Sequence, residues 1–166
     1  YALNAFNVPT NGYGGELDKQ LFASGRMVER AAEHGVTIRR LIGPMTEHKW
    51  HPDSLREFMA FHAEQTQKGR LPSAERKQIR LRTHTVKYGR CDWLSIEQQL
   101  RPYAASQVDA SIAAVGIQSV DGVGAADQKR LELTTENVAV LQIRRDAADS
   151  VVLDHGPVLT LRDGTP

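Results

Sequence analysis

Two short stretches place an ionisable side chain where it could do chemistry. Asp18 lies in Tyr13–Gln20 (YGGELDKQ) and His48 lies in Gly43–Ser54 (GPMTEHKWHPDS), each in a Gly-marked turn between an apolar run and a helix-like segment. A carboxylate that accepts the Nδ1 proton of an imidazole fixes the tautomer and orientation of the ring. It also stabilises the imidazolium that forms when the ring takes a proton from a nucleophile. The two residues are therefore candidates for an acid–base couple.

The first 70 residues show the alternation that would position such a couple. Short apolar runs are followed by Gly- or Pro-marked turns, and then by apolar residues at helical spacing. We expect a strand at Ala2–Val8, a helix from Glu16 with Asp18 in its first turn, a strand at Val36–Ile42, and a helix from Pro52 to about Lys68. This order predicts a parallel, doubly wound α/β sheet. Asp18 and His48 would then lie in loops at the carboxyl ends of neighbouring strands, where working side chains of such sheets gather.

The period of the apolar residues changes after a linker at residues 71–76. Gln78–Tyr88 alternates apolar and polar side chains, as a half-buried strand does, and a turn at Gly89 predicts a hairpin with Cys91–Ile96. Further short β runs follow at Val108–Ala114, Leu131–Thr135, Val138–Ile143, Val151–Leu153 and Val158–Leu161. Residues 77–166 are therefore expected to form a small, all-β, antiparallel sandwich.

The bulk composition excludes several classes of protein. The net charge is +1 and neither half is basic, which argues against a nucleic-acid partner. The apolar runs are only a few residues long, so no membrane-spanning segment is expected. The single cysteine, Cys91, excludes an intramolecular disulfide and cannot form a zinc site alone. No cofactor is indicated.

The two stretches carry a family resemblance. Tyr13-Gly14-Gly15-Glu16-Leu17-Asp18-Lys19-Gln20 and Ile42–Ser54, with its core Gly43-Pro44-Met45-Thr46-Glu47-His48-Lys49-Trp50, resemble the C-terminal end of prolyl oligopeptidase-like α/β-hydrolases. Thr83–Tyr88, Cys91-Asp92-Trp93 and Thr135–Val138 are similar to the β-rich extension of a bacterial group of these proteins. The resemblance implies a serine peptidase or esterase in which Asp18 orients His48, and His48 is the general base. The turn Gly15-x-x-Asp18 favours Asp18 over Glu16 as the acid.

The nucleophile of that family is absent from this chain. It stands in a G-x-S-x-G pentapeptide on an earlier strand, and none of the serines here has that context. The oxyanion-hole segments of the family also lie upstream. We therefore expect the serine to come from sequence before Tyr1 or from a second chain, which includes the possibility of a homo-oligomer, and we expect the substrate to be an ester or a peptide.

Other interpretations of the same residues stay open at this point. Tyr13, Glu16 and Trp50 are candidates for a substrate pocket, although Tyr13 and Trp50 could equally pack in a core. His48, His51 and either Asp18 or Glu47 could form a two-His-one-carboxylate site of a metal-dependent hydrolase or lactonase, although no metal is our leading expectation. Residues 77–166 could instead form a non-catalytic module that binds a glycan or another domain.

Overall fold

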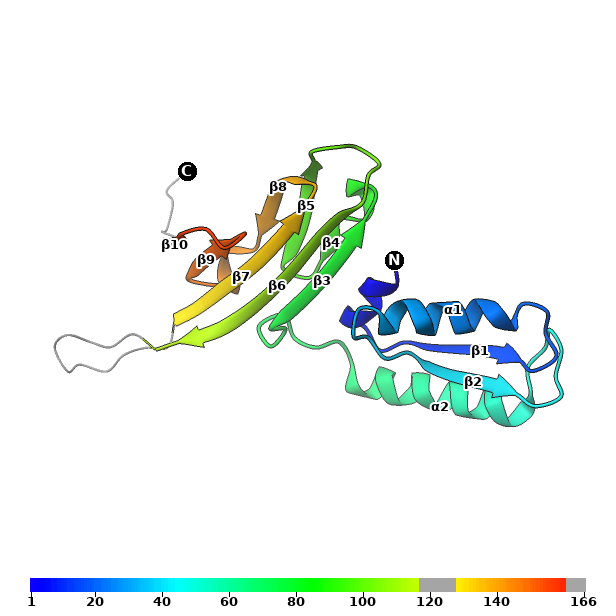
Figure 1. The fold of residues 1–166 in the computed structure, drawn as a ribbon. Helices are drawn as coiled ribbons and strands as arrows, with labels where there is room; N and C mark the ends of the chain where they lie inside the picture. The colour runs from blue at the N-terminus through cyan, green and yellow to red at the C-terminus, as the bar shows by residue number, and fades with distance from the viewer. Residues whose placement is uncertain (117–127, 161–166) are drawn as a thin grey trace. The chain divides into compact units, whose positions relative to one another are not determined.

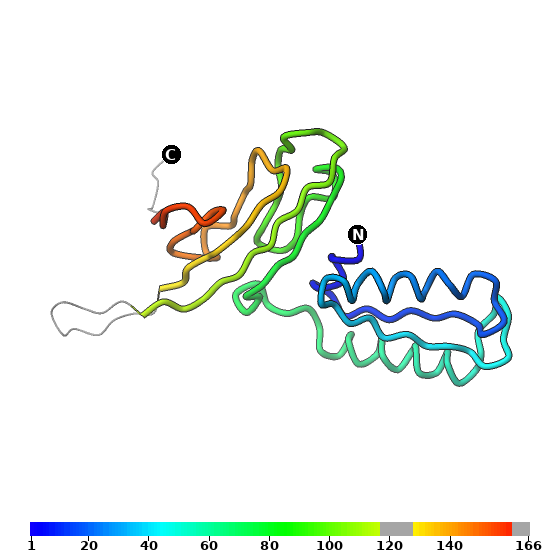
Figure 2. Tube along the Cα trace, viewed as in Figure 1, coloured from blue at the N-terminus to red at the C-terminus, as the bar shows by residue number. Residues whose placement is uncertain are grey.

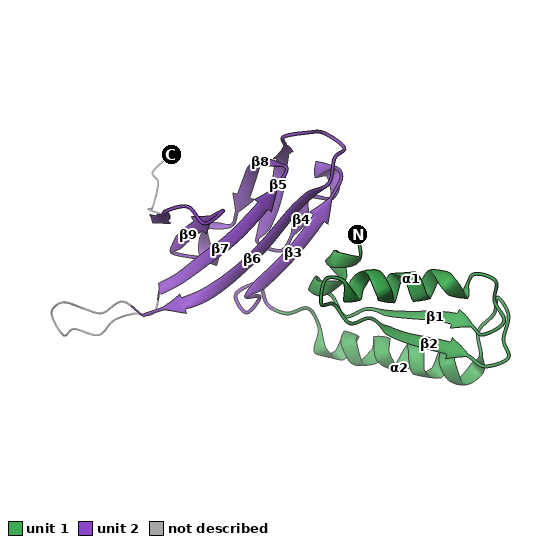
Figure 3. Ribbon diagram, viewed as in Figure 1, with its two compact units in different colours: residues 1–71 green, residues 72–166 purple. Residues whose placement is uncertain are grey.

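The computed structural model describes residues 1–116 and 128–160 of the chain. The protein is a mixed α/β structure with more strand than helix, and its strands form several sheets. It divides into two compact units, Tyr1–Leu71 and Pro72–Pro166 (Figure 3). No described helix is long and apolar enough to cross a membrane.

Unit 1 is a two-stranded parallel sheet flanked by two helices (Figure 1). Its elements are η1 (Ala2–Asn7), β1 (Asn11–Gly15), α1 (Leu21–Ala32), β2 (Arg39–Gly43) and α2 (Pro52–Lys68). The register runs from Asn11 opposite Arg39 to Gly15 opposite Gly43, so the two strands end side by side. The small buried core consists mainly of Ala31, Val36 and Ile38.

The start of unit 1 differs from the sequence prediction. Residues 2–7 form a 3-10 helix instead of a strand, and β1 begins at Asn11, where a turn was expected. Strand pairing overrides the turn preference of this Gly-rich segment, because the parallel register with β2 supplies hydrogen bonds to its backbone. The parallel strand order itself, and the helix with Pro52 at its first position, are as predicted.

The structure also differs from the prediction in the position of Asp18. Helix α1 begins at Leu21, so Asp18 lies in the turn before the helix and not in its first turn. The Asp18 carbonyl accepts a hydrogen bond from the Leu21 amide at 2.9 Å. The acid is therefore held by the turn between β1 and α1, which leaves its carboxylate available to partners outside the helix.

Unit 2 consists of two sheets (Figure 1). The larger sheet has the strand order β10-β9-β7-β6-β3, and the smaller sheet has the order β4-β5-β8. The elements are β3 (Gln78–Thr83), η2 (Val86–Tyr88), β4 (Arg90–Cys91), β5 (Leu94–Gln99), β6 (Ser106–Val115), β7 (Gln128–Glu136), β8 (Val138–Ile143), η3 (Arg145–Ala147), β9 (Ser150–Leu153) and β10 (Val158–Thr160).

One hydrophobic core joins the two sheets of unit 2. Alternate residues of β3 are buried, as predicted: Ile79, Leu81 and Thr83 are buried, whereas Arg80 and Arg82 are not. Leu94 and Ile96 of the smaller sheet belong to the same core cluster. Core residues from both sheets thus pack together, which is the arrangement of two facing layers.

Two pairing predictions for unit 2 were wrong. β3 does not form a hairpin with the segment after Gly89, because η2 intervenes and β3 pairs with β6. β7 and β9 pair in parallel, so the larger sheet is not wholly antiparallel. The predicted strand at Val138–Ile143 has the bounds of β8. Leu161, which was placed in the last strand, lies outside the described residues.

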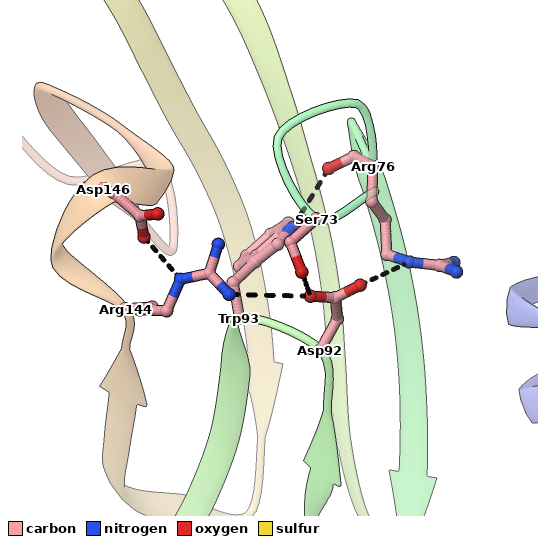
Figure 4. Close-up of polar contacts among 6 residues, drawn as sticks. All are labelled: Ser73, Arg76, Asp92, Trp93, Arg144 and Asp146. Carbon is pink, nitrogen blue, oxygen red and sulfur yellow. Dashed lines mark hydrogen bonds and ion pairs between the residues drawn. The ribbon is translucent and has the colours of Figure 1, made fainter. Parts of the chain in front are cut away.

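The buried carboxylate of Asp92 binds Ser73 and Arg76, which precede the first strand of unit 2 (Figure 4). Asp92, whose side chain is 2% exposed, accepts hydrogen bonds from the Ser73 hydroxyl and from Arg76 Nε, the latter at 2.9 Å. Arg144 Nη1 lies 3.9 Å from the same carboxylate. The Trp93 indole donates to the Arg76 carbonyl at 3.0 Å. A buried charge needs such partners, so the cluster orders the segment before β3.

Candidate active site

The structure brings Asp18 and His48 into direct contact. His48 Nδ1 lies 2.8 Å from Asp18 Oδ2, a normal hydrogen-bond distance. The side chain of His48 is 80% exposed, whereas that of Asp18 is 12% exposed. The carboxylate is thus sheltered while the ring reaches into solvent. This is the geometry in which a carboxylate holds Nδ1 and leaves Nε2 facing outward.

The turn after β1 holds the Asp18 carboxylate in place. The Gln20 amide donates to Asp18 Oδ1 at 2.8 Å, and the Asp18 amide donates to the Gly15 carbonyl at 3.1 Å. The pKa of Asp18 lies below its ordinary value, mainly because of the hydrogen bond from Gln20, and further because of the adjacent His48; partial burial opposes the shift. The acid therefore stays ionised at neutral pH, as an orienting carboxylate must.

The acid turn and the histidine loop are joined by backbone contacts. The Leu17 amide donates to the Thr46 carbonyl at 2.9 Å, and the Glu16 amide donates to the Gly43 carbonyl at 2.9 Å. The Glu16 carboxylate accepts from the Met45 amide at 2.8 Å. These bonds cross from the end of β1 to the end of β2. The distance between the acid and the base is therefore set mainly by the sheet.

Gly15 makes this close approach possible. A Cβ at Gly15 would lie 2.1 Å from the Glu47 carbonyl oxygen and 2.3 Å from the Thr46 carbonyl oxygen. Contacts this short do not occur for a real side chain, so only glycine fits between the two loops. The sequence signal for this role was the Gly14-Gly15 pair just before the acid, which the sequence interpretation used only as part of a turn motif.

Tyr13 and Trp50 stabilise the loop between β2 and α2, which carries His48. The Tyr13 hydroxyl donates to the Lys49 carbonyl at 2.8 Å and accepts from the His51 amide at 2.9 Å, so it bridges the two residues on either side of Trp50. The Trp50 ring stacks on Tyr13 with centroids 4.2 Å apart and meets Phe58 of α2 at 4.9 Å. Gly43 leaves room for the Tyr13 ring, because a Cβ there would lie 2.2 Å from its hydroxyl oxygen.

A shallow hollow lies beside the acid–base pair. It is lined by Leu17, Asp18, Lys19, Gln20, Glu47 and His48. The three residues considered for a substrate pocket, Tyr13, Glu16 and Trp50, do not line it, and their polar or aromatic groups contact the loops instead. Leu17, Lys19 and Gln20 also line the hollow and were not predicted as site residues; they flank the acid in the chain.

Neither serine of unit 1 serves as a partner of His48. The Ser24 hydroxyl donates to the Leu21 carbonyl at 2.9 Å, and the buried Ser54 donates to the Ile42 carbonyl at 3.2 Å. Among the described residues no group of three His, Cys, Asp or Glu side chains is placed to hold a metal ion. The considered site of His48, His51 and a carboxylate therefore does not form.

The arrangement can move a proton but lacks a nucleophile among the described residues around it. A held imidazole whose Nε2 is exposed can take a proton from a hydroxyl or a water and return it to a leaving group. No family model, no curated protein and no solved structure matches the chain.

Proposed function

We propose that the chain supplies the acid and the base of a Ser–His–Asp hydrolase that cleaves esters or peptides. In this proposal unit 1 is the C-terminal part of a doubly wound α/β-hydrolase sheet. His48 is the general base and Asp18 is the carboxylate that orients it. The observation that carries the proposal is the 2.8 Å contact between His48 Nδ1 and a sheltered Asp18, at the carboxyl ends of adjacent parallel strands.

The proton transfers follow from this geometry. His48 Nε2 takes the proton of a serine hydroxyl as its oxygen bonds to the substrate carbonyl carbon. The imidazolium, stabilised by Asp18, then donates that proton to the leaving alcohol or amine as its bond to the carbonyl breaks. Water repeats the sequence on the acyl-enzyme and releases the acid product. The serine and the oxyanion donors come from a segment outside this sequence or from a second chain.

Substitution of His48 in the natural-length protein tests the proposal. Labelling by a fluorophosphonate and hydrolysis of a p-nitrophenyl ester are measured for the wild type and for His48→Ala. We expect loss of both in the variant, because the serine is no longer activated. His62→Ala, which removes an exposed histidine of the same unit, is the matched control and is expected to keep both.

Two outcomes would argue against this function. Hydrolysis by His48→Ala at the wild-type rate would show that the imidazole is not the base. Loss of activity in the presence of a chelator, with metal found by elemental analysis, would favour metal-dependent hydrolysis instead.

A further inference from the structure

The loop between β2 and α2, residues 44–51, contains a backbone conformation that its residue type does not favour. Met45 has a φ of 49°, and it is the one non-glycine residue of unit 1, all of which the structure describes, with a positive φ. At this φ the Cβ comes close to the following carbonyl oxygen, so residues other than Gly, Asn and Asp rarely adopt it. Such a conformation persists only where contacts with other residues hold it.

The conformation of Met45 determines the path of the rest of the loop. The next residue, Thr46, is buried, and its carbonyl accepts from the Leu17 amide at 2.9 Å. His48 follows two residues later and contacts Asp18. Figures 1 and 2 show the loops after β1 and β2 at the same end of unit 1. A different backbone conformation at Met45 would therefore move both Thr46 and His48 away from their partners.

A side chain of the acid turn holds Met45 in this conformation. The Met45 side chain is 76% exposed, so its packing does not explain the φ. The Met45 amide instead donates to the Glu16 carboxylate at 2.8 Å. A carboxylate is a stronger acceptor than a neutral oxygen. Glu16 lies two residues before Asp18, so the turn that carries the acid also holds the start of the loop that carries the base.

The two ends of the loop are held by different residues. The Tyr13 hydroxyl contacts the backbone of Lys49 and His51, which follow the base. Glu16 contacts the backbone before the base. Loss of the Glu16 carboxylate would leave the Tyr13 contacts in place, and it would free the entry into the loop alone.

We propose that Glu16 is a positioning residue of the acid–base pair. By holding Met45 in the left-handed conformation, its carboxylate keeps His48 Nδ1 on Asp18. Glu16 is not among the residues that line the hollow beside the pair, so it acts through the loop and not on the substrate. The effect on catalysis rests on the proposed hydrolase function, whereas the effect on the imidazole does not.

The chemical consequence is the tautomer of His48. The ionised Asp18 carboxylate accepts a proton from Nδ1, so Nε2 of the neutral ring has the lone pair that takes the serine proton. A ring released from Asp18 also populates the tautomer with its proton on Nε2, and that nitrogen cannot accept another. Loss of Glu16 should therefore lower kcat and leave KM nearly unchanged.

Nitrogen NMR measures the tautomer directly. The histidine rings of the natural-length protein are labelled with a nitrogen isotope, and the His48 signals are identified by their absence from His48→Ala. At a pH where the ring is neutral, we expect the Nδ1–H tautomer in the wild type. In Glu16→Ala the ratio of Nδ1–H to Nε2–H should fall about tenfold, as should kcat for a p-nitrophenyl ester, because a hydrogen bond to a charged group has been lost.

Three further variants separate positioning from general destabilisation. Glu16→Gln keeps an acceptor oxygen and should retain most of the tautomer ratio. Met45→Gly, introduced into Glu16→Ala, should restore both the ratio and kcat toward the wild type, because glycine adopts the left-handed conformation without support. Glu57→Ala removes an exposed carboxylate that pairs with Arg39 at the start of β2, and it should change neither quantity. Circular dichroism confirms that each variant is folded.

Three results would overturn the proposal. The first is a wild-type tautomer ratio in Glu16→Ala. The second is a failure of Met45→Gly to restore the ratio. The third is a raised KM with an unchanged ratio, which would assign Glu16 to substrate binding. Failure of the hydrolase function is distinguishable, since His48→Ala would then keep its activity while the tautomer, which is measured without substrate, still decides the role of Glu16.

Discussion

Replacement of Gly15 by alanine should move Asp18 away from His48 without changing either residue. The new Cβ would lie 2.1 Å from the Glu47 carbonyl oxygen, whereas real Cβ contacts do not fall below 3.0 Å, so the two loops must move apart by at least 0.9 Å. The backbone bond from Leu17 to Thr46, 2.9 Å long, crosses the same gap and should break. The Asp18–His48 contact should lengthen by a similar amount.

A displacement of this size has a large catalytic effect. Misplacing reacting groups by about 1 Å can lower the rate by about 10²-fold. For the proposed hydrolase activity, we therefore expect kcat/KM for a p-nitrophenyl ester to fall by about two orders of magnitude in Gly15→Ala. Hydrogen exchange of the Leu17 amide, measured in the same variant, should become faster because its acceptor is lost.

Gly12→Ala provides the matched control on the same strand. A Cβ at Gly12 has no heavy atom within 4 Å, so this variant should keep both activity and exchange rates near the wild type. If Gly15→Ala behaves like Gly12→Ala in both measurements, the reasoning that the sheet sets the acid–base distance is wrong. If exchange accelerates while activity is unchanged, the geometry is as described but the acid–base pair does not perform the reaction.

Three further outcomes are expected. In a carboxyl NMR titration the pKa of Asp18 should lie below its ordinary value of 3.8. The ionised carboxylate therefore stabilises unit 1 above pH 3.8, and this stabilisation is lost as the pH falls through the lowered pKa. His48→Ala should raise that pKa only in part, because the hydrogen bond from the Gln20 backbone amide remains; a shift to 3.8 would contradict this. Asp92→Asn should lower the free energy of unfolding of unit 2 by about 2–4 kcal/mol, measured by urea unfolding with circular dichroism, because it removes a buried charge from its cationic partners. Asp146→Asn, at an exposed pair, should leave that transition in place. Tyr13→Phe should destabilise unit 1 by about 1 kcal/mol, since two backbone groups lose their shared hydroxyl; an unchanged unfolding midpoint would show that water replaces it.

Regular apolar spacing made several elements predictable from sequence. The alternation of Ile79 and Leu81 with Arg80 and Arg82 predicted the inward face of β3, and Pro52 predicted the start of α2. These signals are local, because one strand or one helix carries the whole pattern. Asp18 and His48 lie together as expected for loops after neighbouring parallel strands, although the strand before Asp18 is Asn11–Gly15 and not the predicted Ala2–Val8.

The elements that were missed depend on contacts between distant residues. Asn11–Gly15 has the composition of a turn, and it is a strand only because β2 pairs with it. The partner of β3 is β6, more than 20 residues further along the chain, and no local signal encodes that choice. The support that Tyr13 gives to the His51 amide likewise requires the folded register.

The backbone hydrogen bonds between the ends of β1 and β2 determine how the candidate site unfolds on heating. The acid and the base do not sit on independent loops, because the hydrogen bonds of Leu17 and Glu16 continue the strand pairing up to the reacting groups. Opening of either loop thus requires opening of the sheet end, and the two form one cooperative unit of local unfolding. On heating, the acid–base couple should therefore disappear in a single step together with strand pairing, and gradual fraying of the loops should not precede it.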